Sequence, residues 1–92
     1  MWFHTAPKRS MLEIWITILK AVRSGVHKTT PLNYKTNLQY SKLVKMLDAM
    51  EKKGLLRCEW VGSHRTWYIT TYGIETLEKI TLILSDIDIP KG

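Results

Sequence analysis

The sequence is poor in several residue types, and each shortage excludes a class of protein. Its single cysteine, Cys58, cannot form an internal disulfide or a cysteine-based zinc site. The three histidines, His4, His27 and His64, lie in different segments without the spacing of metal ligands, so we expect no metal. No apolar run reaches the roughly 18–20 residues that a membrane helix needs, and the opening stretch "MWFHTAPKRS" lacks the apolar core of a secretory signal. We therefore expect an intracellular protein with no membrane partner.

The sequence also lacks an assembled set of catalytic residues. No Ser/His/Asp order falls on elements that would converge, and no glycine-rich phosphate loop or paired acid and base is present. The carboxylates gather near the C-terminal end instead. We expect no enzymatic activity, no cofactor and no small-molecule ligand.

The composition that remains is that of a single small domain. Hydrophobic residues make up 45% and charged residues 24% of 92 residues, which favours a globular chain over a disordered one. We expect residues 1–92 to form one domain, with a folded core at about 8–87.

The charge is unevenly distributed along the chain. Fourteen Lys+Arg against eight Asp+Glu give a net charge of +6. Residues 1–27 carry +3, residues 28–53 carry +4, residues 54–72 carry +1 and residues 73–92 carry −2, which together give that value. Such a basic surface indicates an anionic partner, most often nucleic acid, although a solvated basic face without a partner is the alternative.

Residues that begin and end helices define the first helix. Ser10 and Glu13 fit a capping box, and the apolar pattern predicts a helix from Met11 to Ser24 that Gly25 ends.

A second short helix is predicted over "HKTTPLNYKTN". Thr29 or Thr30 can cap it, Pro31 suits its first turn, and Asn37 can end it. A longer third helix follows at about residues 40–53, closed by a glycine. Its apolar stripe consists of Leu43, Met46, Leu47 and Met50.

Alternating apolar residues predict a hairpin from "LLRCEWV" and "RTWYIT", joined by "GSHR". We expect Trp60 and Trp67 to pack inside the base of this hairpin rather than to stack on nucleic-acid bases. Cys58 is expected to be a small inward-facing residue, and a bond to the same cysteine of a second copy is the alternative.

A last helix is predicted at about residues 72–85, capped by Thr70 or Thr71. Leu82 and Ile83 are apolar residues that do not belong to the apolar stripe of this helix.

Three stretches, "KRSMLEIWITILKAV", "NLQYSKLVKMLDAMEKKGLL" and "WYITTYG", carry a family resemblance within the order α-α-α-β-β-α. Over about residues 8–84 they are similar to archaeal winged helix-turn-helix proteins, a family of small chromatin proteins and transcriptional regulators. The resemblance implies an α+β fold that is mainly α. It also implies binding of double-stranded DNA, with the helix at 40–53 in the major groove and the hairpin, as a wing, on the backbone or in the minor groove.

The resemblance implies DNA contacts on the third helix and at the hairpin tip, and we expect further contacts from the second helix. The residues are Thr29, Thr30, Tyr34, Lys35, Gln39, Tyr40, Ser41, Lys42, Lys45, Ser63, His64 and Arg65. Lysine, tyrosine and serine contact phosphates mostly without reading sequence, so we expect modest specificity. For each of these positions the alternative is a solvated polar surface.

Surplus apolar residues near both chain ends predict a homodimer. The residues are Trp2, Phe3, Ile14, Ile18, Leu82 and Ile83. The resulting hypothesis is a homodimeric transcriptional regulator, nucleoid-associated in the cytoplasm, or in the host cytoplasm if the source is viral. The alternatives are a docking module for other proteins and a sequence-tolerant chromatin protein.

Overall fold

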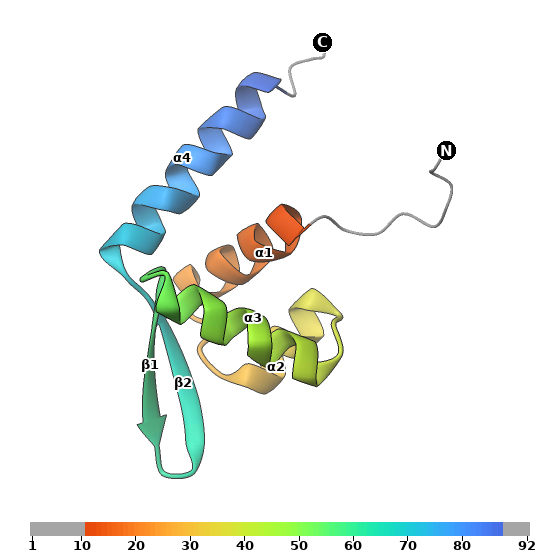
Figure 1. Cartoon of the computed structure of the whole chain (residues 1–92), viewed down its shortest axis with the longest axis vertical. Helices are drawn as coiled ribbons and strands as arrows, with labels where there is room; N and C mark the ends of the chain where they lie inside the picture. Colours follow the sequence, from red (N-terminus) through yellow and green to blue (C-terminus); the bar gives the residue numbers. More distant parts are fainter. Residues whose placement is uncertain (1–10, 88–92) are drawn as a thin grey trace.

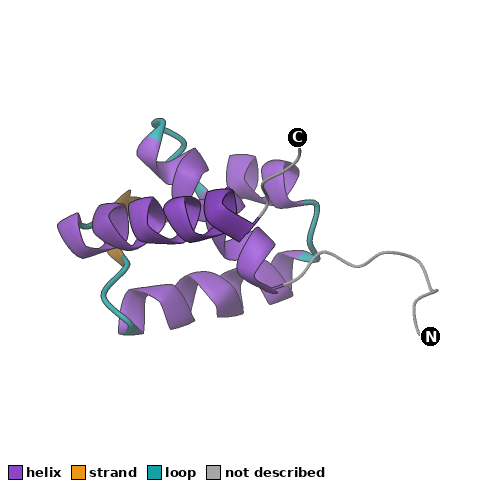
Figure 2. Cartoon of the chain, turned by 90° about the horizontal axis from the view of Figure 1, so that it is seen from above, coloured by secondary structure: helices purple, strands orange, loops and turns teal. Residues whose placement is uncertain are grey.

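The computed structural model describes residues 11–87, which form four helices and one two-stranded antiparallel sheet. In chain order these are α1 (Met11–Arg23), α2 (Thr29–Thr36), α3 (Tyr40–Lys52), β1 (Leu56–Val61), β2 (His64–Ile69) and α4 (Thr71–Ile87). The hairpin projects from one end of the helical body and α4 extends from the other (Figure 1). Helices account for most of the described chain (Figure 2), so the predicted fold class and element order are confirmed. None of these helices has the length and apolarity needed to cross a membrane.

The helix ends follow from residues that adopt left-handed backbone. Gly54 follows α3 with φ of 81°, and this turn lets the Leu55 N–H bond to the Met50 carbonyl at 2.9 Å. The bond closes α3 and directs the chain into β1. Gly25 after α1 and Asn37 after α2 also have positive φ, as their positions in the sequence predicted.

The start of α2 differs from the prediction. Lys28 occupies the N-cap position without a side-chain hydrogen bond, so neither Thr29 nor Thr30 caps the helix. The Thr29 hydroxyl instead accepts a hydrogen bond from the Trp67 indole N–H at 3.1 Å. A contact to a residue far along the chain therefore replaces the local cap. The predicted capping box at Ser10 lies outside the described residues.

The segment between α1 and α2 fastens the hairpin to the helices. Lys28 forms a single β-bridge with Thr66, and the Trp67 N–H donates to the His27 carbonyl at 2.7 Å. The His27 ring nitrogen Nδ1 lies 2.8 Å from the Trp67 carbonyl oxygen. These contacts, two between backbone groups and one from the His27 ring, hold the start of α2 beside β2.

The hairpin runs from Leu56 opposite Ile69 to Val61 opposite His64. Its loop is therefore residues 62–63, two residues shorter than the predicted "GSHR". The difference adds His64 to β2 and places Arg65, which the predicted loop and the predicted strand shared, within the strand.

The core lies between the helices and the inner face of the hairpin. Its fully buried members include Trp67, Ile18, Leu19, Leu32, Leu43, Leu47 and Leu56. Trp67 is buried as predicted. Ile14 and Ile18 are 8% and 0% exposed, so the expectation that they belong to surplus surface is wrong. The face of α1 that carries them is covered by the rest of the chain.

The start of α4 is crowded against the start of β1. The Thr70 hydroxyl accepts the Gly73 N–H at 2.9 Å and so caps the helix, as predicted. The same hydroxyl donates to the Gly54 carbonyl at 2.6 Å. A side chain at Gly73 would place its Cβ 2.2 Å from the Leu55 carbonyl oxygen. Glycine at this position is what lets α4 begin directly beside the hairpin.

Candidate nucleic-acid interface

The exposed side of α3 carries the polar residues that the helical spacing placed there. Tyr40 is 55% exposed, and Ser41, Lys42 and Lys45 are also exposed. Gln39 is exposed at the N-cap without a side-chain hydrogen bond to the helix. The opposite side is buried through Leu43, Met46, Leu47 and Met50, so the predicted stripe is confirmed. Because the core fixes this stripe, the lysines are presented on a rigid support.

The polar residues of α2 fall into two groups. Tyr34 is 82% exposed, and Thr30 and Lys35 are exposed beside it. Thr29 is half-buried and held by the Trp67 indole. Thr30, Tyr34 and Lys35 are therefore open to a partner, whereas the hydroxyl of Thr29 already has a structural use.

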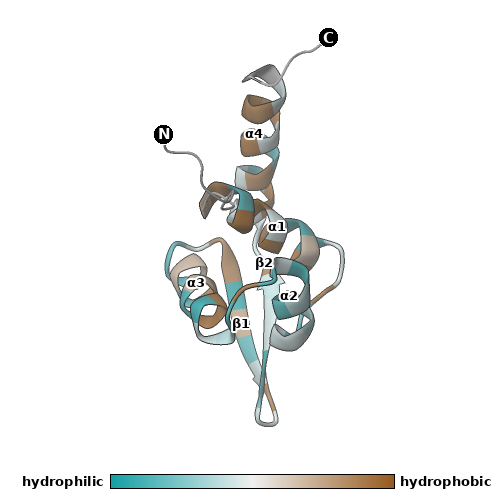
Figure 3. Ribbon diagram, turned by 90° about the vertical axis from the view of Figure 1, so that its right-hand side faces the viewer, coloured by the Kyte–Doolittle hydropathy of each residue, from teal (hydrophilic) through white to brown (hydrophobic). Residues whose placement is uncertain are grey.

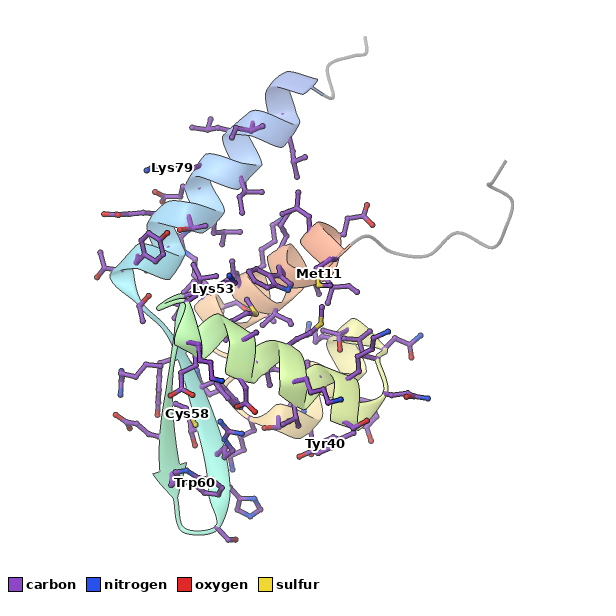
Figure 4. All side chains as sticks on the ribbon, in the orientation of Figure 1. Met11, Tyr40, Lys53, Cys58, Trp60 and Lys79 are labelled. Carbon is purple, nitrogen blue, oxygen red and sulfur yellow. The ribbon has the colours of Figure 1, made fainter. Side chains whose placement is uncertain are left out.

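A cleft of about 420 Å³ separates the hairpin from the starts of α2 and α3. Six of the predicted DNA contacts line it, namely Thr29, Thr30, Tyr40, Ser63, His64 and Arg65. The other six predicted contacts are exposed to solvent but do not line the cleft, namely Tyr34, Lys35, Gln39, Ser41, Lys42 and Lys45. Tyr40 at the start of α3 and Trp60 on the hairpin stand on different sides of the cleft (Figure 4). The candidate interface thus continues from the cleft onto the outer surfaces of α2 and α3.

Arg65 is not free at the hairpin tip, and the prediction that placed it there is wrong. Its guanidinium lies 2.7 Å from the Asp48 carboxylate and 3.8 Å from that of Glu51, both on α3. It also lies over the ring of Trp67, 4.4 Å from the centroid. The side chain is 24% exposed. Arg65 lies within β2 because the loop is shorter than predicted, so the residue is one pair inside the tip. Its side chain is on the strand face that is turned toward α3.

A further contact keeps the Arg65 side chain in place. Its Nε–H donates to the Cys58 sulfur at 3.3 Å. This cysteine is half-buried, and its sulfur has a partner within the chain. Partial burial opposes the charged form, but the hydrogen bonds to Cys58 and Asp48 outweigh that effect and raise the pKa of Arg65. The arginine therefore remains a cation tied to α3.

The arrangement of three helices, a hairpin and a last helix is shared with known proteins. Residues 8–86 match the winged helix-turn-helix family. The chain belongs to that family. In this family the hairpin is the wing, and α3 holds the position of the recognition helix. A comparison with curated proteins finds no match.

Several solved structures have a similar fold. AF1382 from Archaeoglobus fulgidus has a TM-score of 0.73 at 21% identity, over 86% of this chain and 88% of that one. A winged-helix DNA-binding protein from STIV has a TM-score of 0.73 at 15% identity, over 92% and 100%. Sso10a-2, a DNA-binding protein from Sulfolobus solfataricus, has a TM-score of 0.67 at 24% identity, over 86% and 85%. At these identities the likeness establishes a common fold.

Trp60 contradicts the prediction that it packs inside the base of the wing. It is 66% exposed and lines the cleft. Each strand residue advances about 3.3 Å, so Trp60 lies roughly 13 Å along β1 from Leu56, beyond the helices that bury the first residues. An inward strand position near the tip therefore faces the cleft and not the core.

Lys28 also lines the cleft and was not predicted from the sequence, although it directly precedes the two threonines that begin α2.

The predicted dimer surface is present only in part. Leu82 and Ile83 on α4 are 66% and 57% exposed, as the surplus of apolar residues required. On α1 the exposed apolar residues are Met11 and Leu12 rather than the buried isoleucines. Apolar residues continue along the projecting half of α4 (Figure 3).

A groove of about 610 Å³ lies between α1 and α4. Leu77 and Leu82 line it, and an ion pair between Arg23 and Glu78 joins the two helices at 3.4 Å. Trp2 and Phe3, the remaining residues of the predicted dimer surface, lie outside the described residues.

Proposed function

We propose that this protein binds double-stranded DNA through α3 and the cleft beside the wing. The observation that carries the proposal is the array of exposed lysines and hydroxyls on the starts of α2 and α3, held on one side of a rigid core. In helix-turn-helix proteins the first turns of the second helix of the motif enter the major groove. Here those turns carry Tyr40, Ser41, Lys42 and Lys45. Two proteins of similar fold are DNA-binding proteins by name, which agrees with this use of the surface.

The exposed residues favour contacts that are not sequence-specific. Lysine attracts phosphate as a point charge, and tyrosine and serine add hydrogen bonds to the backbone. None of the exposed residues on α3 is an arginine, the residue that most often reads guanine. Of the two arginines on the wing, Arg65 is held by Asp48. We therefore expect weak discrimination between sequences, consistent with a regulator or a chromatin protein.

The same proposal includes a homodimer that regulates transcription. The exposed apolar surface of α4 and the start of α1 supports the dimer, because monomeric soluble proteins rarely expose a contiguous apolar patch. The wing that borders the cleft and the projecting half of α4 lie at opposite ends of the molecule (Figure 1). A dimer formed there would leave both recognition helices accessible.

A mobility-shift titration on mixed-sequence duplex at two salt concentrations tests DNA binding. Affinity should fall steeply with salt, because each neutralised phosphate releases counterions with a slope near 0.9. Four lysine contacts would give a loss of roughly a hundredfold over a fourfold increase in salt. A docking module that binds another protein through the apolar groove between α1 and α4 would show no binding to the duplex, and that result would overturn the proposal.

A further inference from the structure

Trp60 presents a large aromatic ring to an open cleft. Tryptophan is usually well buried, yet this side chain is 66% exposed. It is opposite Arg65 in the register, and the guanidinium of that arginine lies 5.7 Å from the ring centroid. Trp60 therefore lies on the same inner strand face as the buried Trp67, but with no core residue to cover it.

The surroundings of the ring combine an aromatic wall with cationic groups. Lys28 and Thr30 line the cleft from the side of α2, and His64 and Arg65 line it from the wing. At about 420 Å³ the cleft has the size of sites that enclose small planar molecules. A purely apolar occupant would make no ionic contact with the cationic side chains, and a simple anion would leave the indole ring exposed to solvent.

A nucleotide satisfies both parts of the cleft. Its base offers a flat π-face to the indole, and its phosphate offers charge to Lys28. In an intact duplex the faces of the bases are covered by their neighbours, so only a base that has left the stack could reach the ring. Stacking on aromatic side chains is the usual way in which proteins hold such bases.

We propose that the cleft between the wing and α2 takes an unpaired base of DNA, which stacks on the indole of Trp60. The inference rests on the proposed DNA binding and extends it from regular duplex to distorted or partly single-stranded DNA. Trp60 supplies the stacking surface, and Lys28 holds the adjoining phosphate.

Two duplexes of equal length test the proposal, one fully paired and one with a single bulged base, each titrated at the same salt concentration. The bulged base is a fluorescent purine analogue, whose emission falls when it stacks on an indole. The wild-type protein should bind the bulged duplex about tenfold more tightly and quench the analogue. Trp60→Ala should bind the two duplexes equally and leave the analogue bright, while Trp60→Phe should keep part of the preference.

Val61→Ala is the matched control, because Val61 is the neighbouring wing residue and is 58% exposed but does not line the cleft. It should keep the full preference. Equal binding of the two duplexes by the wild-type protein, or a preference that survives Trp60→Ala, would overturn the stacking site while DNA binding stands. Failure to bind either duplex would overturn the proposed function, and the stacking site with it.

Discussion

Arg65 connects the wing to α3 through an ion pair and an aromatic contact. Arg65→Ala should lower the free energy of unfolding by about 1–2 kcal/mol, because a partly exposed ion pair and the stacking on Trp67 are both lost. For a domain of this size that loss corresponds to a fall of roughly 4–16 °C in melting temperature, measurable by circular dichroism. The value is well above what a free arginine at a wing tip would give.

Arg57→Ala provides the matched comparison on the other strand. Arg57 pairs with Glu59 and lies 4.7 Å from the Tyr68 ring centroid, but its side chain is 54% exposed and is not tied to a helix. Its loss should cost less than half as much. Equal losses in the two variants would mean that the contact of Arg65 with α3 does not stabilise the wing.

Single residues show where sequence patterns stop predicting structure. The strand pattern predicted that both Trp60 and Trp67 pack inside the base of the wing, and only Trp67 does. The pattern defines which side of a strand a residue faces, but not how far the helices extend to cover it. The pairing of Arg65 with Asp48 was equally hidden, because it joins residues 17 positions apart on different elements.

At the scale of elements, α3 is the part of the interface that a double substitution can test. Changing Lys42 and Lys45 together to alanine should weaken binding to all duplex sequences alike. The slope of log affinity against log salt should fall by about two, because two phosphate contacts are removed. Mobility-shift titrations over a range of salt concentrations would measure it.

The other end of the same helix offers a control with the same change of charge. Lys52 and Lys53 are exposed at the C-terminal end of α3, away from the turns expected to meet DNA. Their double alanine variant should keep the slope nearly unchanged. If both pairs lowered the slope equally, net charge rather than the start of α3 would account for binding.

Elements with a strong period were predicted best. The stripe of α3 follows the helical repeat, and its buried residues and its glycine end are as expected. The wing was located correctly, but its loop was drawn two residues too long, since alternation alone does not show which residues pair last. The N-cap of α2 was missed because the threonine at its start bonds to Trp67 instead.

At the scale of the whole molecule, charge and apolar surface are separated along the chain. The lysines of α2 and α3 belong to the segment of net charge +4, whereas residues 73–92 have a net charge of −2. A polyanion should therefore approach from the wing end, and the acidic end should turn away from it. The exposed apolar residues of α4 lie within the acidic segment, where a contact between two copies would not compete with DNA.

Replacing Leu82 with Glu and Ile83 with Lys tests that contact. Both side chains are more than half exposed, so the variant should fold, and the charges should prevent two copies from packing together. Sedimentation should show a dimer for the wild-type protein and a monomer for the variant. DNA binding should weaken strongly, because a dimer places two recognition helices on half-sites about 34–36 Å apart and a monomer engages only one.

Val61→Glu is the control, because it introduces a charge at an exposed apolar residue of the wing and should leave the dimer intact. A wild-type protein that sediments as a monomer at micromolar concentrations would refute the dimer and would leave the α4 surface for a different partner.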